Sequence, residues 1–321
     1  MLWDGSHETI RVKRNQMEYC VELAKKNCFS KYLSVTNDGV FLVKPALEDC
    51  VGGDRLLVLE EALNILEAQD LEHAVIKTLT YPPKDVNDFD ILIDTDSICS
   101  TEKIFEKKGF QSVEREYPYK IKLVKKSTVI DLYNEIVEDD IIFMDKRNIL
   151  DTASTVRVGD FDVPVPSNEN EVLLILVNSV FGDDIRRIML MYQVLFNVSE
   201  IDIDSFLSHC RSFILGCYLG LVAIRNFNEL LVRVPCQKLN RLIQLIATEH
   251  SLLSSVVQRN MACHKNVLYN MPQRYPLLAY VVALGESCHY QHSRAECFRY
   301  LRNLRRAIGV RIKHKHELVL G

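Results

Sequence analysis

The sequence lacks the features that would place it outside the cell or in a membrane. None of its ten cysteines is spaced C-x-x-C, and the N-terminus has no apolar stretch like that of a secretory signal. The longest uncharged run spans residues 212–224, whereas a membrane-spanning helix needs about 20 residues. These absences predict a soluble, cytoplasmic protein without a membrane partner, whose cysteines are reduced and mostly buried thiols.

Several motifs of common enzyme classes are also missing. Without G-x-G-x-x-G or G-x-x-x-x-G-K-[ST], neither a dinucleotide-binding nor a P-loop fold has support. The motifs G-x-S-x-G and H-E-x-x-H are also absent, so the sequence does not support the hydrolase classes that carry them. The chain contains 321 residues, of which 48% are hydrophobic and 26% charged. That balance is typical of a globular protein, and the length favours two domains.

The hydrophobic pattern predicts a mixed unit of helices and strands up to about Pro166. Asp54 is a suitable N-cap, and the leucines that follow it recur at helical spacing. Gly109 is suited to end a helix. The expected elements are a helix at 54–68, strands at 73–79 and 89–93, a helix at 101–108, a hairpin at 119–124 and 128–133, and a strand pair at 157–165.

Beyond Pro166 nearly every segment is predicted to be helical. We therefore divide the chain into an N-terminal extension at 1–53, whose packing the pattern does not reveal, an α/β (α+β) domain at 54–166, and an all-helical domain at 167–321 with a basic C-terminal segment. The expected helices are 171–180, 184–196, 205–232, 237–259, 276–289 and 294–308.

Three aspartates are placed where an ordinary strand would not need them. Asp88 and Asp90 open the buried strand at 89–93, and residues two apart in a strand project to the same side. Asp131 lies inside a second apolar strand, Thr128 to Tyr133. Clustered carboxylates repel and are costly to desolvate unless a cation neutralises them. Mg²⁺ or Mn²⁺ suits such an oxygen-only set, and two metals can activate a hydroxyl and stabilise leaving pyrophosphate.

A pair of aspartates two residues apart is weak support for a metal site when it stands alone. Aspartate is common at strand starts and in turns. Asp94 and Asp96 form a rival pair at the far end of the same strand, which we interpret as a solvated exit turn. Asp131, on a second apolar strand, strengthens the case for Asp88 and Asp90.

The order of these elements resembles the nucleotidyltransferase superfamily, whose fold is shared with DNA polymerase β. The signature of that family is a helix, a strand, a loop containing Gly-Ser or Gly-Gly, a strand with h-D-x-D-h, and a later strand with h-D-h. This chain supplies HAVIKTL, NDFDILID, VIDLY and the later VPVPSNENEVLLILVNS. More specifically, it is similar over about residues 54–196 to poorly characterised prokaryotic members.

The resemblance implies an enzyme that transfers a nucleoside monophosphate from a nucleoside triphosphate to a hydroxyl of an unidentified acceptor. Asp88, Asp90 and Asp131 would then be the catalytic residues and the ligands of Mg²⁺ or Mn²⁺. Asp131 would also help to deprotonate the acceptor, which could be a protein, an RNA or a small molecule. Lys77 and Thr78 would lie near the triphosphate.

Two departures from the family pattern leave a second hypothesis open. The glycine turn is missing, because Lys77 is followed by Thr78, Leu79 and Thr80. Glycine normally lets backbone amides approach the phosphates. Tyr133 also stands where relatives often have histidine. The alternative is a non-catalytic binding or regulatory protein of the toxin–antitoxin type.

Two features near the C-terminus are a group of cysteine and histidine residues and a basic segment. Cys288, His289, His292 and Cys297 lie close together, but their spacing matches no common zinc site. Residues 294–317 hold eight Lys/Arg and two Asp/Glu, in a chain whose net charge is −4. Such a segment is either a solvated helix face or a surface for RNA, which Arg299, Arg302 and Arg306 would contact.

The basic segment yields a prediction about salt dependence. If Arg302 and Arg306 contact phosphates, replacing both by alanine should weaken RNA binding at low salt. Each lost contact should flatten the log–log salt dependence by about one unit. Filter binding to tRNA over a salt series measures this slope, and nucleoside triphosphate affinity should not change. If the unmutated protein shows no salt-sensitive RNA binding, the segment is a solvated surface.

Overall fold

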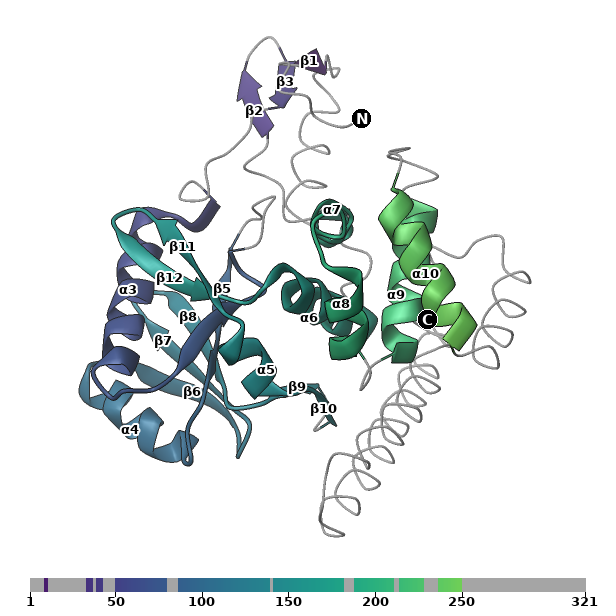
Figure 1. Ribbon diagram of the computed structural model, residues 1–321. Helices are drawn as coiled ribbons and strands as arrows, with labels where there is room; N and C mark the ends of the chain where they lie inside the picture. Colours follow the sequence, from purple (N-terminus) through teal and green to yellow (C-terminus); the bar gives the residue numbers. More distant parts are fainter. Residues whose placement is uncertain are drawn as a thin grey trace, which may run out of the picture.

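The computed structural model describes residues 9–10, 33–36, 39–42, 50–79, 86–138, 141–181, 188–210, 214–227 and 236–249 (Figure 1). The predictions for the C-terminal segment, with Arg299, Arg302 and Arg306, lie outside the described residues. So do those for the cysteine and histidine cluster at 288–297.

The first structural unit is built on a five-stranded mixed sheet, which confirms the expected fold class. Its strand order is β4-β5-β8-β7-β6, and β5 and β8 are parallel while the other neighbours are antiparallel. A parallel central pair forces the chain to cross over the sheet between β5 and β8. The strands are β4 (His73–Ile76), β5 (Asp88–Ile93), β6 (Gln111–Glu116), β7 (Lys120–Lys125) and β8 (Thr128–Tyr133).

The hairpin of β7 and β8 is confirmed by its turn. Lys126 and Ser127 have φ of 47° and 63°, as two-residue turns require when they match the twist of the flanking strands. The edge strand β6 was not predicted. Its sequence, QSVERE, is almost entirely exposed, so it has no alternation of apolar and polar residues for a pattern to detect.

Helices α3 (Gly53–Glu67) and α4 (Ile98–Lys107) cover one face of the sheet (Figure 1). The helix α3 begins after Gly52, whose φ is 88°, so Asp54 lies in the first turn and is not the N-cap. Ser97 caps α4 by accepting a hydrogen bond from the amide of Ser100, and Gly109 follows its end with φ 85°. The buried leucines of α3 pack on Phe89, Ile91 and Ile130.

Short elements complete this unit. The pair β11 (Ser154–Val158) and β12 (Phe161–Val165) turns at Gly159, as the predicted strand pair required. The other short elements are β1 (Thr9–Ile10), β2 (Leu33–Thr36) and β3 (Gly39–Leu42) in a separate sheet, β9 (Ile136–Glu138) paired with β10 (Ile141–Met144), and α5 (Lys146–Asp151).

Every described residue range from 168 onward is mainly helical. The elements are α6 (Asn168–Phe181), α7 (Ile188–Asn197), α8 (Ile203–His209), α9 (Ile214–Phe227) and α10 (Gln237–Glu249). The single helix expected at 205–232 was wrong, because α8 ends at a cap on Cys210 and α9 begins at Ile214. No proline or glycine lies between α8 and α9, so the sequence pattern did not mark this boundary.

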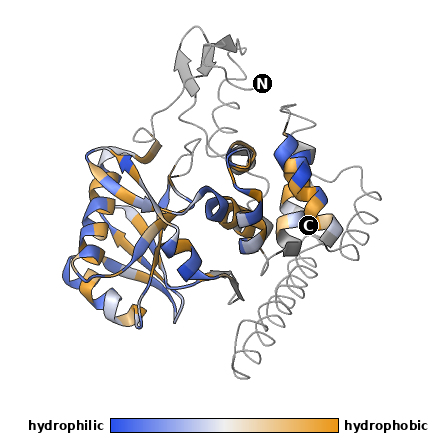
Figure 2. Ribbon diagram, in the orientation of Figure 1, coloured by the Kyte–Doolittle hydropathy of each residue, from blue (hydrophilic) through white to orange (hydrophobic). Residues whose placement is uncertain are grey.

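The helices share a core with the second face of the sheet. Ala74, Ile76, Leu92 and Tyr133 project from this face into the cluster that contains most of α6. Figure 2 shows apolar residues along both the strands and the helices beside them. The division into domains at 53 and 166 stays a prediction, because this core joins the sheet to the helices.

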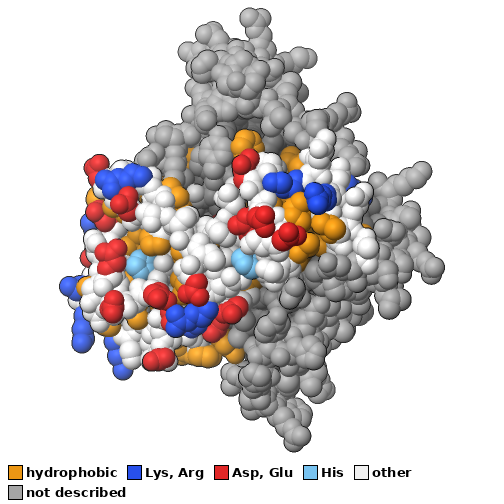
Figure 3. Space-filling model, viewed as in Figure 1, with side chains coloured by type: hydrophobic (Ala, Val, Ile, Leu, Met, Phe, Trp, Pro, Cys, Tyr) orange, Lys and Arg blue, Asp and Glu red, His pale blue; other side chains and the backbone are white. Residues whose placement is uncertain are grey.

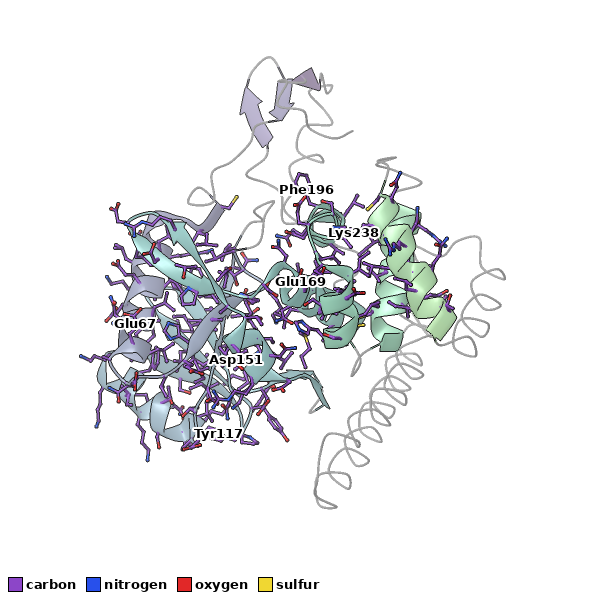
Figure 4. All side chains as sticks on the ribbon, in the orientation of Figure 1. Glu67, Tyr117, Asp151, Glu169, Phe196 and Lys238 are labelled. Carbon is purple, nitrogen blue, oxygen red and sulfur yellow. The ribbon has the colours of Figure 1, made fainter. Side chains whose placement is uncertain are left out.

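Polar contacts fasten the helices to one another (Figure 4). The ammonium of Lys238 donates to the carbonyls of Ser199, at 2.6 Å, and Ile201, at 2.9 Å. Glu169 accepts a hydrogen bond from the amide of Asp202 at 2.6 Å. None of the helices in the described ranges is long and apolar enough to cross a membrane.

A matched pair of leucines in α3 tests this packing. Leu59 is fully buried and Leu57 is 61% exposed. Leu59→Ala should lower the free energy of unfolding by about 2–5 kcal/mol, because it leaves a cavity. Leu57→Ala should change it by less than about 0.5 kcal/mol. Urea denaturation measures both, and equal effects would contradict the orientation of the helix.

Candidate active site

The strands β5 and β8 bring two of the predicted aspartates together. Asp90 pairs with Asp131 in the parallel register, and Asp88 pairs with Val129. Residues in register on neighbouring strands project to the same face. The side chain of Asp90 is 16% exposed and that of Asp131 is 5% exposed, while Asp88 is an exposed residue. The acids therefore share one face, with Asp88 at its outer end.

The alternation of each strand explains this placement. The neighbours Phe89, Ile91, Ile130 and Leu132 face α3 and α4 in the apolar core. The aspartates must then project to the opposite face, where Leu92 and Tyr133 pack with the helical part. The carboxylates consequently lie on the side of the sheet that meets α6.

Each buried or half-buried carboxylate has its own lysine. Lys77 Nζ lies 3.2 Å from Asp90 Oδ2, and Lys120 Nζ lies 2.8 Å from Asp131 Oδ2. Both ammonium groups also lie 4.9 Å from the centre of the Tyr133 ring. Cations at this distance from an aromatic face are attracted by its quadrupole. Tyr133, noted above as a departure from the family pattern, thus contacts both lysines of the acid pair.

The turn after β4 replaces the missing glycine with a left-handed lysine. Lys77 has a φ of 57°, a conformation that costs a non-glycine residue roughly 1–2 kcal/mol. Its amide donates to Glu171 Oε2 on α6 at 3.2 Å. The hydroxyl of the buried Thr78 donates to the Ile76 carbonyl and accepts from the Asp90 amide. Thr78 therefore supports the turn from inside the fold.

Glu171 was not predicted as a site residue. It is only 7% exposed and reaches the turn from the first turn of α6. The available signal was an acidic residue immediately before the apolar run VLLILV. Near the start of a helix an acid is expected for its favourable interaction with the helix dipole, so its position did not indicate a contact elsewhere.

Burial dominates the electrostatics of Asp131. Desolvation raises the pKa of its carboxyl above the ordinary value, the ion pair with Lys120 opposes that rise, and the nearby charge of Asp90 adds to it. Asp131 Oδ1 is buried and has no hydrogen-bond partner. A buried acceptor without a partner is costly, and a cation beside Asp90 and Asp131 would remove that cost.

The acid pair therefore fits a divalent cation, although not as a three-aspartate cluster. Within the described residues, no three His, Cys, Asp or Glu side chains are grouped closely enough to hold a metal ion. Asp90 and Asp131 are the pair in register, and Asp88 lies two residues before Asp90 on β5.

The rival pair at the other end of β5 has a structural role. Asp94 forms ion pairs with Lys146, at 3.0 Å, and with Arg147, both at the start of α5. Asp94 is thus not the solvated turn residue expected from the sequence, whereas Asp96 is exposed. Lys146 also lies 3.6 Å from Glu135. This network fixes α5 to the sheet at the opposite end from Asp88.

A pocket of about 400 Å³ lies outside the acid pair, between the end of α3 and α5. Figure 4 labels Glu67 and Asp151 in its wall, and Figure 3 shows acidic and basic side chains interspersed on this face. The pocket contains neither Asp90 nor Asp131.

The arrangement can now be compared with known proteins. A parallel strand pair carries the acids, a hairpin extends the sheet, and helices follow. No protein-family model matches the sequence, and a search of curated proteins finds no similar sequence.

Three solved structures show a weak likeness to this chain, at low identity. The lincosamide antibiotic adenylyltransferase LnuA is 16% identical, with 38% of this chain and 85% of that chain covered and a TM-score of 0.30. The antibiotic-resistance factor ANT(2'')-Ia is 11% identical, with 64% of this chain and 98% of that chain covered and a TM-score of 0.35. A nucleotidyltransferase-like protein from Paracoccidioides brasiliensis is 12% identical, with 64% of this chain and 91% of that chain covered and a TM-score of 0.33. Likenesses this low carry no functional argument.

The buried carboxyl yields a prediction about pH. Because the pKa of Asp131 is raised in the folded protein, its contribution to stability is present at low pH and is lost as pH rises through that pKa. Asp131→Asn should therefore gain stability relative to the unmutated protein between about pH 3 and pH 7. Each unit by which the pKa is raised adds about 1.4 kcal/mol.

Thermal unfolding without metal at a series of pH values measures this difference. Asp162→Asn is the control, because Asp162 is exposed and pairs only at the surface with Arg157. A stability difference for Asp131→Asn that shrinks as pH rises would contradict the argument.

Proposed function

We propose that this protein transfers a nucleoside monophosphate from a nucleoside triphosphate to a hydroxyl of an acceptor. The observation that carries the proposal is the pair Asp90 and Asp131, in register on parallel strands, with Asp131 Oδ1 buried and without a partner. Like charges on one face of neighbouring strands destabilise each other, and a divalent cation would relieve that repulsion.

We assign each residue of the site a separate role. Asp90 and Asp131 would hold Mg²⁺ or Mn²⁺, with Asp88 contributing from the outer end of the same face. When bound, the metal stabilises negative charge on the transferring phosphate and lowers the pKa of an attacking hydroxyl. Asp131 would accept the acceptor's proton, a role suited to a carboxyl whose pKa burial raises.

The turn after β4 would lie beside the triphosphate. Lys77 carries the charge for that contact and is 15% exposed. Thr78 is 3% exposed and bonds to the backbone, so we assign it the support of the turn. The acceptor, whether protein, RNA or small molecule, would be selected by the helical part.

A specific observation favours the second candidate, a non-catalytic binding or regulatory protein. The ammonium groups of Lys77 and Lys120 already neutralise the two acids, and Glu171 uses the amide of the turn. A fold that stabilises its acids in this way does not require a metal for stability. The two candidates differ in turnover, which the following experiment measures.

Incubation with each labelled nucleoside triphosphate, Mn²⁺ and cell extract should label one class of acceptor and release pyrophosphate. Asp90→Asn and Asp131→Asn should reduce this transfer at least about 100-fold, because each removes a charge that holds the metal. Asp96→Asn is the matched control, since it belongs to the rival pair and is exposed.

Calorimetric titration with each nucleotide separates the alternatives. Binding without pyrophosphate release, unchanged by Asp90→Asn, would support the regulatory protein. No binding of any nucleotide with Mg²⁺ or Mn²⁺ would exclude both candidates.

A further inference from the structure

The acid pair is bracketed by a second pair of side chains of opposite charge. Lys77 comes from the turn after β4 and Lys120 from the start of β7, and both ammonium groups lie over the ring of Tyr133. Because Asp90 and Asp131 are themselves neighbours, the two carboxylates, the two ammonium groups and the ring form one cluster. Each lysine therefore contacts one acid and the shared ring.

A divalent cation at the acid pair must compete with these lysines. Lys120 Nζ lies 2.8 Å from Asp131, and its side chain is only 17% exposed. Like charges a few ångströms apart repel by several kcal/mol at the effective dielectric of a protein, about 4 kcal/mol at 4 Å. Metal and ammonium cannot both lie against the same carboxylates without that cost, so metal binding should displace the lysines.

The displaced ammonium groups can move to new positions within the site. Lysine has a flexible four-carbon stem with three rotatable donors, and both side chains retain some exposure, at 15% and 17%. The face of Tyr133 stabilises a cation in a range of positions above the ring. What a displaced ammonium then lacks is an anionic partner, and the phosphates of a triphosphate supply one.

We propose that Lys77 and Lys120 are exchangeable counter-cations. They neutralise Asp90 and Asp131 when no metal is present, and they move to the phosphate oxygens when a divalent cation takes the carboxylates. The cation and the triphosphate therefore bind cooperatively, and each binds weakly alone. This inference rests on the proposed function and adds an order of events to the same site.

A purely structural ion pair explains the contacts less well. Buried ion pairs are weak sources of stability, and this one leaves Asp131 Oδ1 without a partner. Exchange explains both features, because the unpaired oxygen is a ligand position that only the metal-bound state uses.

The test measures Mn²⁺ alone, by the loss of the free-ion signal in electron paramagnetic resonance. Lys120→Met should bind Mn²⁺ at least tenfold more tightly than the unmutated protein, because the competing cation is gone. The matched control is Lys125→Met, which removes the same charge from the same strand and at the same exposure, but from an ammonium that pairs with Glu61 on α3 at 2.7 Å. The control should change Mn²⁺ affinity less than threefold.

A second variant guards against a folding defect in the first. Lys77→Gly removes the other ammonium and suits the left-handed backbone of the turn, where φ is 57°. It should also tighten Mn²⁺ binding at least tenfold. With inorganic tripolyphosphate and Mn²⁺ together, both variants should bind the polyphosphate at least tenfold more weakly, which reverses the sign of the effect.

The outcomes separate this inference from the proposed function. Unchanged or weaker Mn²⁺ binding in folded Lys120→Met and Lys77→Gly overturns the exchange. Equal tightening in Lys125→Met also overturns it, because general charge would then suffice. Tight Mn²⁺ binding in the lysine variants without nucleotide transfer by the unmutated protein supports the exchange and rejects the enzyme.

Discussion

Two aspartates in register on neighbouring parallel strands place like charges on one face of the sheet, and neutralising them stabilises the fold. Asp90 and Asp131 share a register position, and the second is nearly buried. Their repulsion and the cost of desolvation act together on the folded state. Lys77 and Lys120 supply the opposite charge from the two strands that flank the pair. The position of both lysines, and of the ring between them, follows from that requirement.

The same constraint shapes the sheet around it. One face is uniformly apolar and packs against α3 and α4. The other face is divided, with apolar residues such as Ile76 and Leu92 packing on the helices and the charged residues gathered beside them. Because Glu171 of α6 bonds to the amide of Lys77, the helices also fix the turn that holds one counter-ion. Movement of α6 would therefore change the electrostatics of the acid pair directly.

The hydrophobic pattern of the sequence predicted some elements correctly and missed others. The strand at 89–93 and the hairpin at 119–133 were confirmed, because buried alternation and turn residues act locally. The strand β6 was missed, since an exposed edge strand carries little local signal, and the separation of α8 from α9 was missed as well. The lysine at the turn was noticed only for its nearness to a missing glycine. Its left-handed backbone places its amide against Glu171, which is 94 residues away.

The sequence alone determined that Asp88 and Asp90 share a face and that Asp131 lies in a buried strand, because strand alternation depends only on neighbours along the chain. The tertiary structure decided which acid stands beside Asp131. The parallel register selects Asp90 and leaves Asp88 at the outer end. It also decided which cations neutralise the pair. Ion pairs form through space between strands that the sequence separates, and their partners depend on strand order, which no local pattern specifies.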